Sequence, residues 1–151
     1  VYDKISPGEK AYAQKNLAHS FIALAEMEKR SENCQSAIEA WQDALEYYTE
    51  ERAPMEHADI LRGLAYAYIL LSREEPEEEV WLKKALKCYK KALPIYQQRE
   101  REMAGMEGPA AHEAGERAES CRRSLQSCRA MIKARRKQKT EQLQKKEENG
   151  K

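Results

Sequence analysis

Small and apolar residues recur every three or four positions along almost the whole chain, which is the period of an amphipathic α-helix. The first such run opens with Ser6, Pro7 and Glu9, a helix start with a serine cap, proline at the first helical position and glutamate three residues after the cap. Three later runs also follow a proline, at Pro54, Pro76 and Pro109. The pattern predicts an all-α fold with helices at about 8–30, 34–52, 54–73, 76–101 and 109–145. Pro94 falls inside the fourth helix, where its missing N–H predicts a kink.

An internal repeat underlies this pattern. Residues 37–48 align with residues 85–96 at an offset of 48, and residues 17–24 align with residues 64–71 at an offset of 47. The matched pairs include Leu17 with Leu64, Ala18 with Ala65, Ala37 with Ala85, Ala44 with Ala92 and Tyr48 with Tyr96. Because the matches keep helical spacing, each unit is predicted to be a pair of helices.

The repeated motif is Leu-Ala-x-x-aromatic in a first helix and Ala-aliphatic-x-x-aromatic-x-x-Ala-Leu in a second. It resembles the tetratricopeptide repeat over about residues 11–100, with a period longer than the family's usual 34 or so residues. The resemblance implies antiparallel helical hairpins stacked as a short solenoid. Two repeats, at about 8–52 and 54–101, then make up residues 1–108. Packing explains the motif, since small residues let helices approach and aromatic side chains fill the gaps between neighbours.

The resemblance also implies a binding surface, because tetratricopeptide proteins bind partners on the concave face lined by the first helix of each unit. Aligning Leu17 and Leu64 with the family's common leucine places eight candidate residues there: Tyr12, Lys15, Asn16, His19, Asp59, Arg62, Tyr66 and Ile69. The family's chaperone-binding branch holds a C-terminal carboxylate with Lys and Asn, but here His19 and Gly63 replace the asparagines. A full carboxylate clamp is therefore not expected. The alternative is that these side chains are only solvated or packed at helix edges.

The fifth predicted helix carries a narrow seam of mostly small residues at three-four spacing: Ala111, Ala114, Ala118, Cys121, Leu125, Cys128 and Ile132. One interpretation is a capping helix over residues 109–132 that packs on residues 76–100, since the last unit of a solenoid needs a polar outer face. The other interpretation is a homodimer seam through the fifth helix.

Charge is distributed unevenly along the chain. Residues 1–116 hold 15 Lys and Arg against 22 Asp and Glu, whereas residues 117–151 hold 12 against 4. Residues 133–151 are expected to form a basic, partly disordered helical tail, because only Ala134 and Leu143 are apolar after Ile132 and nothing is predicted to hold the tail to the body. Its candidate binding residues are Lys133, Arg135, Arg136, Lys137 and Lys139. Such a cluster can bind nucleic-acid phosphates, although no aromatic residue is interleaved for base stacking.

Catalytic chemistry finds no support in the sequence. The chain has no phosphate-binding glycine loop, no HExxH and no GxSxG, and its four cysteines and three histidines lack the spacing of a zinc site. We expect no enzyme activity, no cofactor and no metal. Glu77 to Glu79 are explained by helix initiation, because acidic residues in a first turn complement the helix dipole.

The sequence therefore predicts a protein-protein interaction adaptor or scaffold that binds a peptide or helix. The alternatives are a nucleic-acid-associated protein that uses its basic helix and a structural subunit of a larger assembly. No stretch approaches the ~20 apolar residues needed to cross a bilayer, so no membrane partner is expected. A cytoplasmic location is predicted, with the nucleus as the alternative if the source is a eukaryote.

Overall fold

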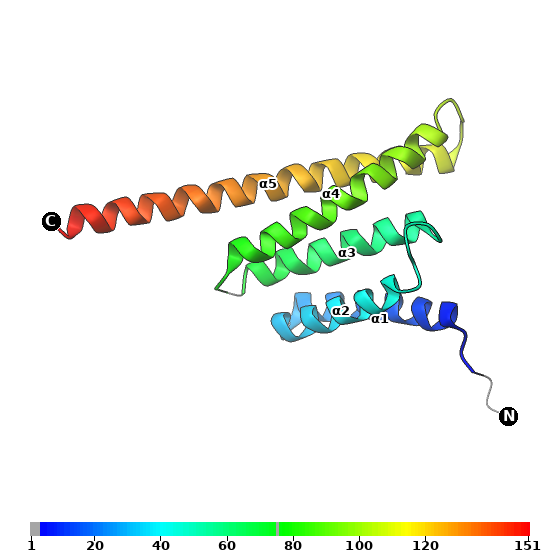
Figure 1. The fold of residues 1–151 in the computed structure, drawn as a ribbon, viewed down its shortest axis with the longest axis horizontal. Coiled ribbons are helices and arrows are strands. Elements are labelled where there is room, and N and C mark those ends of the chain that lie inside the picture. The colour runs from blue at the N-terminus through cyan, green and yellow to red at the C-terminus, as the bar shows by residue number, and fades with distance from the viewer. Residues whose placement is uncertain (1–3, 75) are drawn as a thin grey trace.

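The computed structural model describes residues 4–74 and 76–151, which form five helices and no strand (Figure 1). The helices are α1 (Pro7–Met27), α2 (Arg30–Leu45), α3 (Pro54–Ser72), α4 (Glu78–Glu102) and α5 (Pro109–Asn149). The predicted all-α class is confirmed. Successive helices pack on one another from α1 to α5, so that two hairpins lie one above the other and α5 runs along α4 (Figure 1).

Helix starts agree well with the proline signals. The Ser6 hydroxyl accepts from the Glu9 amide at 3.2 Å, and the Glu9 carboxylate accepts from the Ser6 amide at 2.9 Å, which is the predicted cap. Pro54 also begins its helix, as does Pro109. α4 begins two residues after Pro76 and continues through Pro94, so the kink stays a prediction.

Two helix ends come earlier than the sequence predicts. α1 stops at Met27 because Lys29 adopts a left-handed conformation, with φ of 44°, and the Asn33 side-chain amide donates to the Glu28 carbonyl at 2.9 Å. α2 stops at Leu45 rather than at residue 52. There Arg52 donates to the Tyr47 carbonyl at 3.0 Å, and its guanidinium lies 4.4 Å from the centre of the Tyr47 ring. These polar contacts satisfy backbone groups that a longer helix would have paired.

Three helices bury small residues at a seven-residue spacing. These residues are Ala11, Ala18 and Ala25 on α1, Ala58, Ala65 and Ser72 on α3, and Ala114, Cys121 and Cys128 on α5. Small side chains at such positions let neighbouring helices approach closely. The α5 seam is thus buried in the same way as those of α1 and α3, and it packs against α4. A homodimer through this seam would first have to separate α5 from α4.

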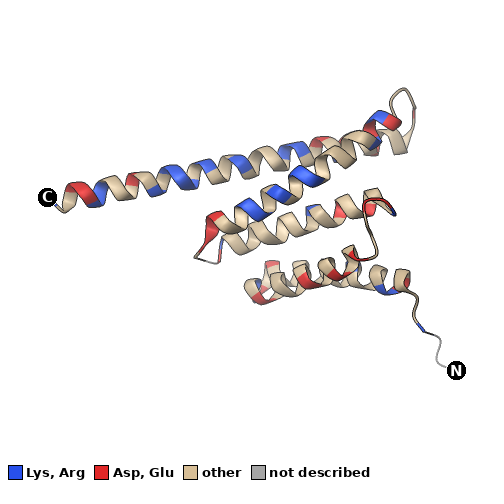
Figure 2. Cartoon of the chain, viewed as in Figure 1, with Lys and Arg blue, Asp and Glu red and all other residues tan. Residues whose placement is uncertain are grey.

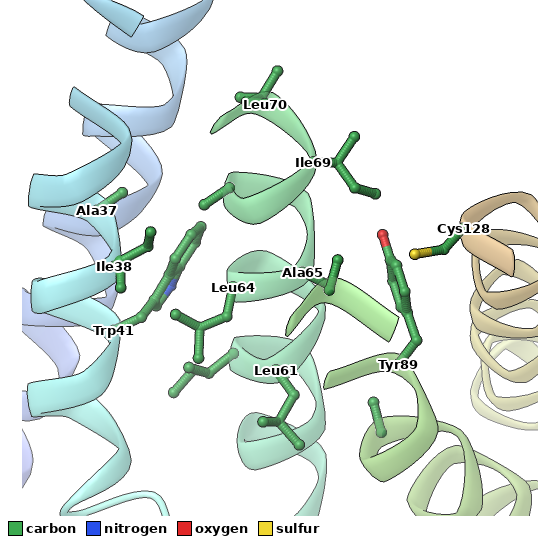
Figure 3. Packing of buried hydrophobic residues seen from close by; sticks show 14 of the residues in the cluster. Ala37, Ile38, Trp41, Leu61, Leu64, Ala65, Ile69, Leu70, Tyr89 and Cys128 are labelled. Atoms are coloured by element: carbon green, nitrogen blue, oxygen red, sulfur yellow. The ribbon is translucent and has the colours of Figure 1, made fainter. Parts of the chain in front are cut away.

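The two hairpins meet around one tryptophan. Trp41 projects from α2 toward α3 and is 2% exposed (Figure 3). A Cβ atom added at Gly63 of α3 would lie 2.5 Å from Cζ2 of that ring, so glycine is required for this close approach. In the second hairpin, the equivalent Tyr89 lies next to Cys128 of α5 (Figure 3). Each hairpin therefore directs its repeat aromatic toward the next helix of the array.

Ala44, aligned with Ala92 in the repeat, is fully buried and tests the close packing of α2. Ala44→Leu is expected to lower the free energy of unfolding by about 1–3 kcal/mol, because the extra methylene groups must displace well-packed neighbours. Chemical denaturation measures this loss. An unchanged free energy of unfolding would mean that the helices are not in close contact at Ala44.

Candidate functional site

The predicted site residues of the first unit lie on α1 and differ in their surroundings. Tyr12 is 57% exposed. The Lys15 ammonium lies 5.4 Å from the Tyr12 ring centre and 5.3 Å from that of Tyr48, so it is held between two aromatic faces. Asn16 is exposed, and the exposed His19 contacts the Trp41 ring edge-on, with the ring centres 5.4 Å apart.

The second unit repeats the cation-on-tyrosine contact of the first. The Arg62 guanidinium lies 5.6 Å from the centre of the Tyr96 ring, and both residues are repeat equivalents of Lys15 and Tyr48. Arg62 also donates to the Ser120 hydroxyl of α5 at 2.9 Å. The repeat alignment predicted Arg62 as the equivalent of Lys15, but it predicted neither the contact with Tyr96 nor the hydrogen bond to Ser120.

Asp59 joins three helices. Its carboxylate accepts from the Tyr96 hydroxyl of α4 at 2.5 Å and from Arg117 of α5 at 3.2 Å. Burial of the Tyr96 ring, together with the hydrogen bond to Asp59, raises the pKa of the phenol well above its ordinary value. Asp59 is thus engaged within the protein, and its first role in this conformation is to tie α3 to α4 and α5.

Tyr66 and Ile69 lie in contrasting surroundings on α3. The Tyr66 hydroxyl donates to Glu26 of α1 at 2.6 Å, and this bond and partial burial raise the pKa of Tyr66. Tyr66 remains 38% exposed. Ile69 is only 8% exposed and belongs to the core, so it offers almost no surface to a partner.

These contacts define a surface shared by α1, α3 and α5, which we name the first-helix face. Its connections are the Tyr66 bond to Glu26 of α1 and the Arg62 bond to Ser120 of α5, made from positions about one helical turn apart on α3. Its most exposed predicted members are Tyr12, Asn16, His19 and Tyr66. Glu26, Arg117 and Ser120 were missed from the sequence because their importance depends on which helices become neighbours.

The basic tail is attached to the body at its base, contrary to the expectation that nothing holds it. Arg135 pairs with Glu78 at 2.8 Å, and Arg136 pairs with Glu79 at 2.8 Å. Hydrogen bonds from Arg136 and Lys83 hold the pKa of Glu79 below its usual value. The acidic first turn of α4 therefore has a tertiary role besides helix initiation. Lys133, Lys137 and Lys139 are exposed, and α5 stays helical to Asn149.

A basic groove of about 320 Å³ lies between α4 and α5 near these ion pairs. We name it the α4–α5 groove; it is lined by Lys83, Leu86, Arg129, Ile132, Lys133 and Arg136. Lysines continue along α4, and Figure 2 shows this basic character on both helices, against the more acidic first hairpin. The three-four spacing of Lys83, Lys87 and Lys90 was the sequence signal for this surface, which the charge analysis of the tail overlooked.

The four cysteines are free thiols, and burial raises the pKa of each. For Cys34 and Cys88 the pKa rises to about 11. Because the folded pKa of these thiols exceeds the unfolded value near 8.5, they do not lower the stability of the fold below that pH. As the pH rises toward 11, the thiols ionise first in the unfolded state, and the free energy of unfolding falls. Such thiols are poor nucleophiles at neutral pH.

We expect alkylation of native protein by iodoacetamide at pH 7.5 or so to be at least about 100-fold slower than in denaturant, because thiolate is scarce and access is closed. The rate should rise steeply above pH 9 or so, as the thiols ionise and the fold weakens. Mass spectrometry counts the modified cysteines. Rapid labelling of Cys34 or Cys88 in the native protein at neutral pH would show that the thiol is accessible and that its pKa is not raised.

Other kinds of site find no support in the described part of the chain. Within residues 4–74 and 76–151, no three His, Cys, Asp or Glu side chains are placed to hold a metal ion together. Of the helices described, none combines the length and apolar character that a membrane crossing requires. Comparisons with protein-family models, with curated proteins and with solved structures find no match to this chain.

Proposed function

We propose that this chain is a non-catalytic adaptor that binds a peptide or helix of another protein on the first-helix face, in the manner of a short tetratricopeptide-like solenoid. The observation that carries the proposal is the repeated placement of a first-helix cation over the repeat-equivalent tyrosine of its own unit. Lys15 over Tyr48 and Arg62 over Tyr96 occupy equivalent positions at similar distances. Equivalent contacts in two units support a common geometry, which is the basis of an extended binding surface.

The chemistry of the face suits a protein segment better than a small molecule. Tyr12 and Tyr66 expose aromatic surface, and aromatic side chains contribute a large share of the energy of protein interfaces. Asn16 and His19 add hydrogen-bonding groups between them. Arg62 and Asp59 are committed to bonds within the protein and serve to position the helices. We infer that an extended or helical segment would lie along α1 and α3.

A photo-reactive amino acid in place of Asn16 tests this role in the native cell. We expect a discrete crosslinked protein at Asn16, whereas the same amino acid in place of Gln98, which is exposed on α4 away from this face, should give none. The double variant Tyr12→Ala and Tyr66→Ala should abolish the crosslink at Asn16 without changing helicity. Crosslinks at Gln98 alone, or a crosslink at Asn16 that survives both substitutions, would place the partner elsewhere.

Nucleic-acid association through the basic tail is the second candidate, and the observation that favours it is the continuation of the tail's cations onto α4. A short duplex should then bind with a slope of log affinity against log salt of roughly −3 to −6 over about 50–200 mM, as a handful of phosphates are neutralised. Changing Lys133, Lys137 and Lys139 to Gln should make the slope shallower, whereas changing Lys4, Lys10 and Lys29 to Gln should leave it unchanged. No binding at the lowest salt would eliminate this candidate.

A further inference from the structure

α1 exposes an apolar stripe that the repeat buries in its second unit. Leu17 is 46% exposed and Leu24 is 42% exposed, whereas their equivalents on α3, Leu64 and Leu71, are 4% and 0% exposed. Ala13, Ser20 and Met27 are also exposed and complete a four-three spacing along the helix. On α3 the equivalent stripe is covered by the preceding hairpin, since Leu64 lies beside Trp41 of α2 (Figure 3). Within residues 4–74 and 76–151, the stripe on α1 is therefore a stacking surface that no helix covers.

Carboxylates accompany this stripe on the first hairpin. Exposed acidic residues lie on α2 at Glu32, Glu39 and Asp43, and Glu46 follows the last residue of that helix. Asp43 and Glu46 line a groove with Gln14 of α1, one helical turn before Leu17, and with the cations Lys10 and Arg52. Residues 1–53 hold ten Asp and Glu against six Lys and Arg. This end of the array thus combines exposed leucines with negative charge.

The opposite end of the array has the complementary character. In the α4–α5 groove, Leu86 and Ile132 provide apolar surface and Lys83, Arg129, Lys133 and Arg136 provide positive charge. Glu79, which pairs with both Lys83 and Arg136, offsets part of that charge. The side chains of Arg129 and Lys133 are exposed beside the buried seam of α5. Residues 117–151 hold 12 Lys and Arg against 4 Asp and Glu.

We propose that the α4–α5 groove binds the first hairpin of a second copy of this chain, so that copies associate head to tail. Opposite charge and apolar surface on both ends argue for this occupant. The same molecule cannot satisfy its own groove, because α1 and α5 lie at opposite ends of the helix order and α3 and α4 separate them (Figure 1). Two different surfaces meet in such a contact, so it can extend into chains or close into a ring. It uses residues outside the first-helix face and does not depend on the proposed adaptor role.

Sedimentation velocity on nuclease-treated protein tests the contact, from micromolar to near-millimolar concentration at low and at physiological salt. We expect the average mass to rise with concentration and to fall with salt, because exposed ion pairs are screened. The hairpin variant Glu39→Lys with Asp43→Lys and the groove variant Arg129→Glu with Lys133→Glu should each remain monomeric. As a matched control on the same helix, Lys145→Glu with Lys146→Glu should associate like the original chain.

An equimolar mixture of the hairpin variant and the groove variant gives the sharpest result. The intact groove of the first binds the intact hairpin of the second, and the reversed hairpin of the first matches the reversed groove of the second. The mixture should therefore associate in alternation, although each variant alone stays monomeric. A chain carrying all four reversals should associate again, because its two ends are once more opposite in charge. The proposal is overturned if the original chain stays monomeric at low salt. It is overturned equally if the mixture stays monomeric, or if the tail control loses association as completely as the groove variant.

Discussion

Trp41→Ala should lower the free energy of unfolding by about 3–5 kcal/mol, the range for removing a large buried aromatic side chain. The ring is 2% exposed and lies where α2 meets α3, so its loss leaves a cavity between the two hairpins. Since a domain of this kind is stable by only about 5–15 kcal/mol, the variant should unfold at much lower denaturant concentration. Urea denaturation followed by circular dichroism at 222 nm or so measures the change through the loss of helix.

The matched control for this prediction is Trp81→Ala. Trp81 is half-buried and stacks on Tyr68 at the surface, with 5.9 Å between the ring centres. Its removal exposes less new surface and leaves no closed cavity, so the loss should be less than half of that for Trp41. Equal losses at both positions would show that Trp41 does not occupy a core between the hairpins.

Cys128→Asp should separate α5 from α4. The Cys128 thiol is 0% exposed and lies 3.2 Å from the Leu82 carbonyl, so a carboxylate there would be buried beside an acceptor. The expected loss is about 3–5 kcal/mol, as for an uncompensated buried charge. Burial raises the pKa of such a carboxyl above the unfolded value near 3.9, so the destabilisation should be smaller at about pH 4 than at pH 7.

Hydrogen exchange locates this effect, and Ser127→Asp provides its control. Ser127 is exposed on the outer side of the same helix, so Asp there should change stability by no more than about 0.5 kcal/mol. In the Cys128 variant, residues 109–132 should lose protection from exchange first. Protection that is retained throughout α5 would mean that its seam is not packed against α4.

Helical period and proline signals predicted most of this fold because they depend on local chemistry. The α1 start at Pro7 and the α3 start at Pro54 follow from residues next to them in the chain. The early end of α2 was missed because Arg52 folds back on Tyr47. The spacing of hydrophobic residues does not indicate such a polar contact. Starts marked by a proline were therefore predicted to within two residues, whereas α2, which no proline precedes, begins at Arg30 instead of residue 34.

The candidate surfaces were predictable only in part, since a repeat aligns positions without showing what covers them. The alignment made Lys15 and Arg62 equivalent, but it did not predict that each lies over a tyrosine. It could not distinguish the exposed Leu17 from the buried Leu64, because among the described residues only the second is covered by another hairpin. Likewise, the pairing of Arg136 with Glu79 joins residues far apart in sequence, and only the packing of α5 on α4 brings them together.

Stacking of the two hairpins is the central claim, because α1 and α3 share a face only if Trp41 packs on Gly63. The most direct measurement is the free energy of unfolding of Gly63→Ala in two backgrounds, the original chain and Trp41→Leu. Alanine normally stabilises a helix interior by about 1 kcal/mol relative to glycine. In the original chain the added Cβ would meet the ring at 2.5 Å, so we predict a net loss of stability. In the Trp41→Leu background the same substitution should be neutral or stabilising, and a gain in stability in the original chain would contradict the stacked arrangement.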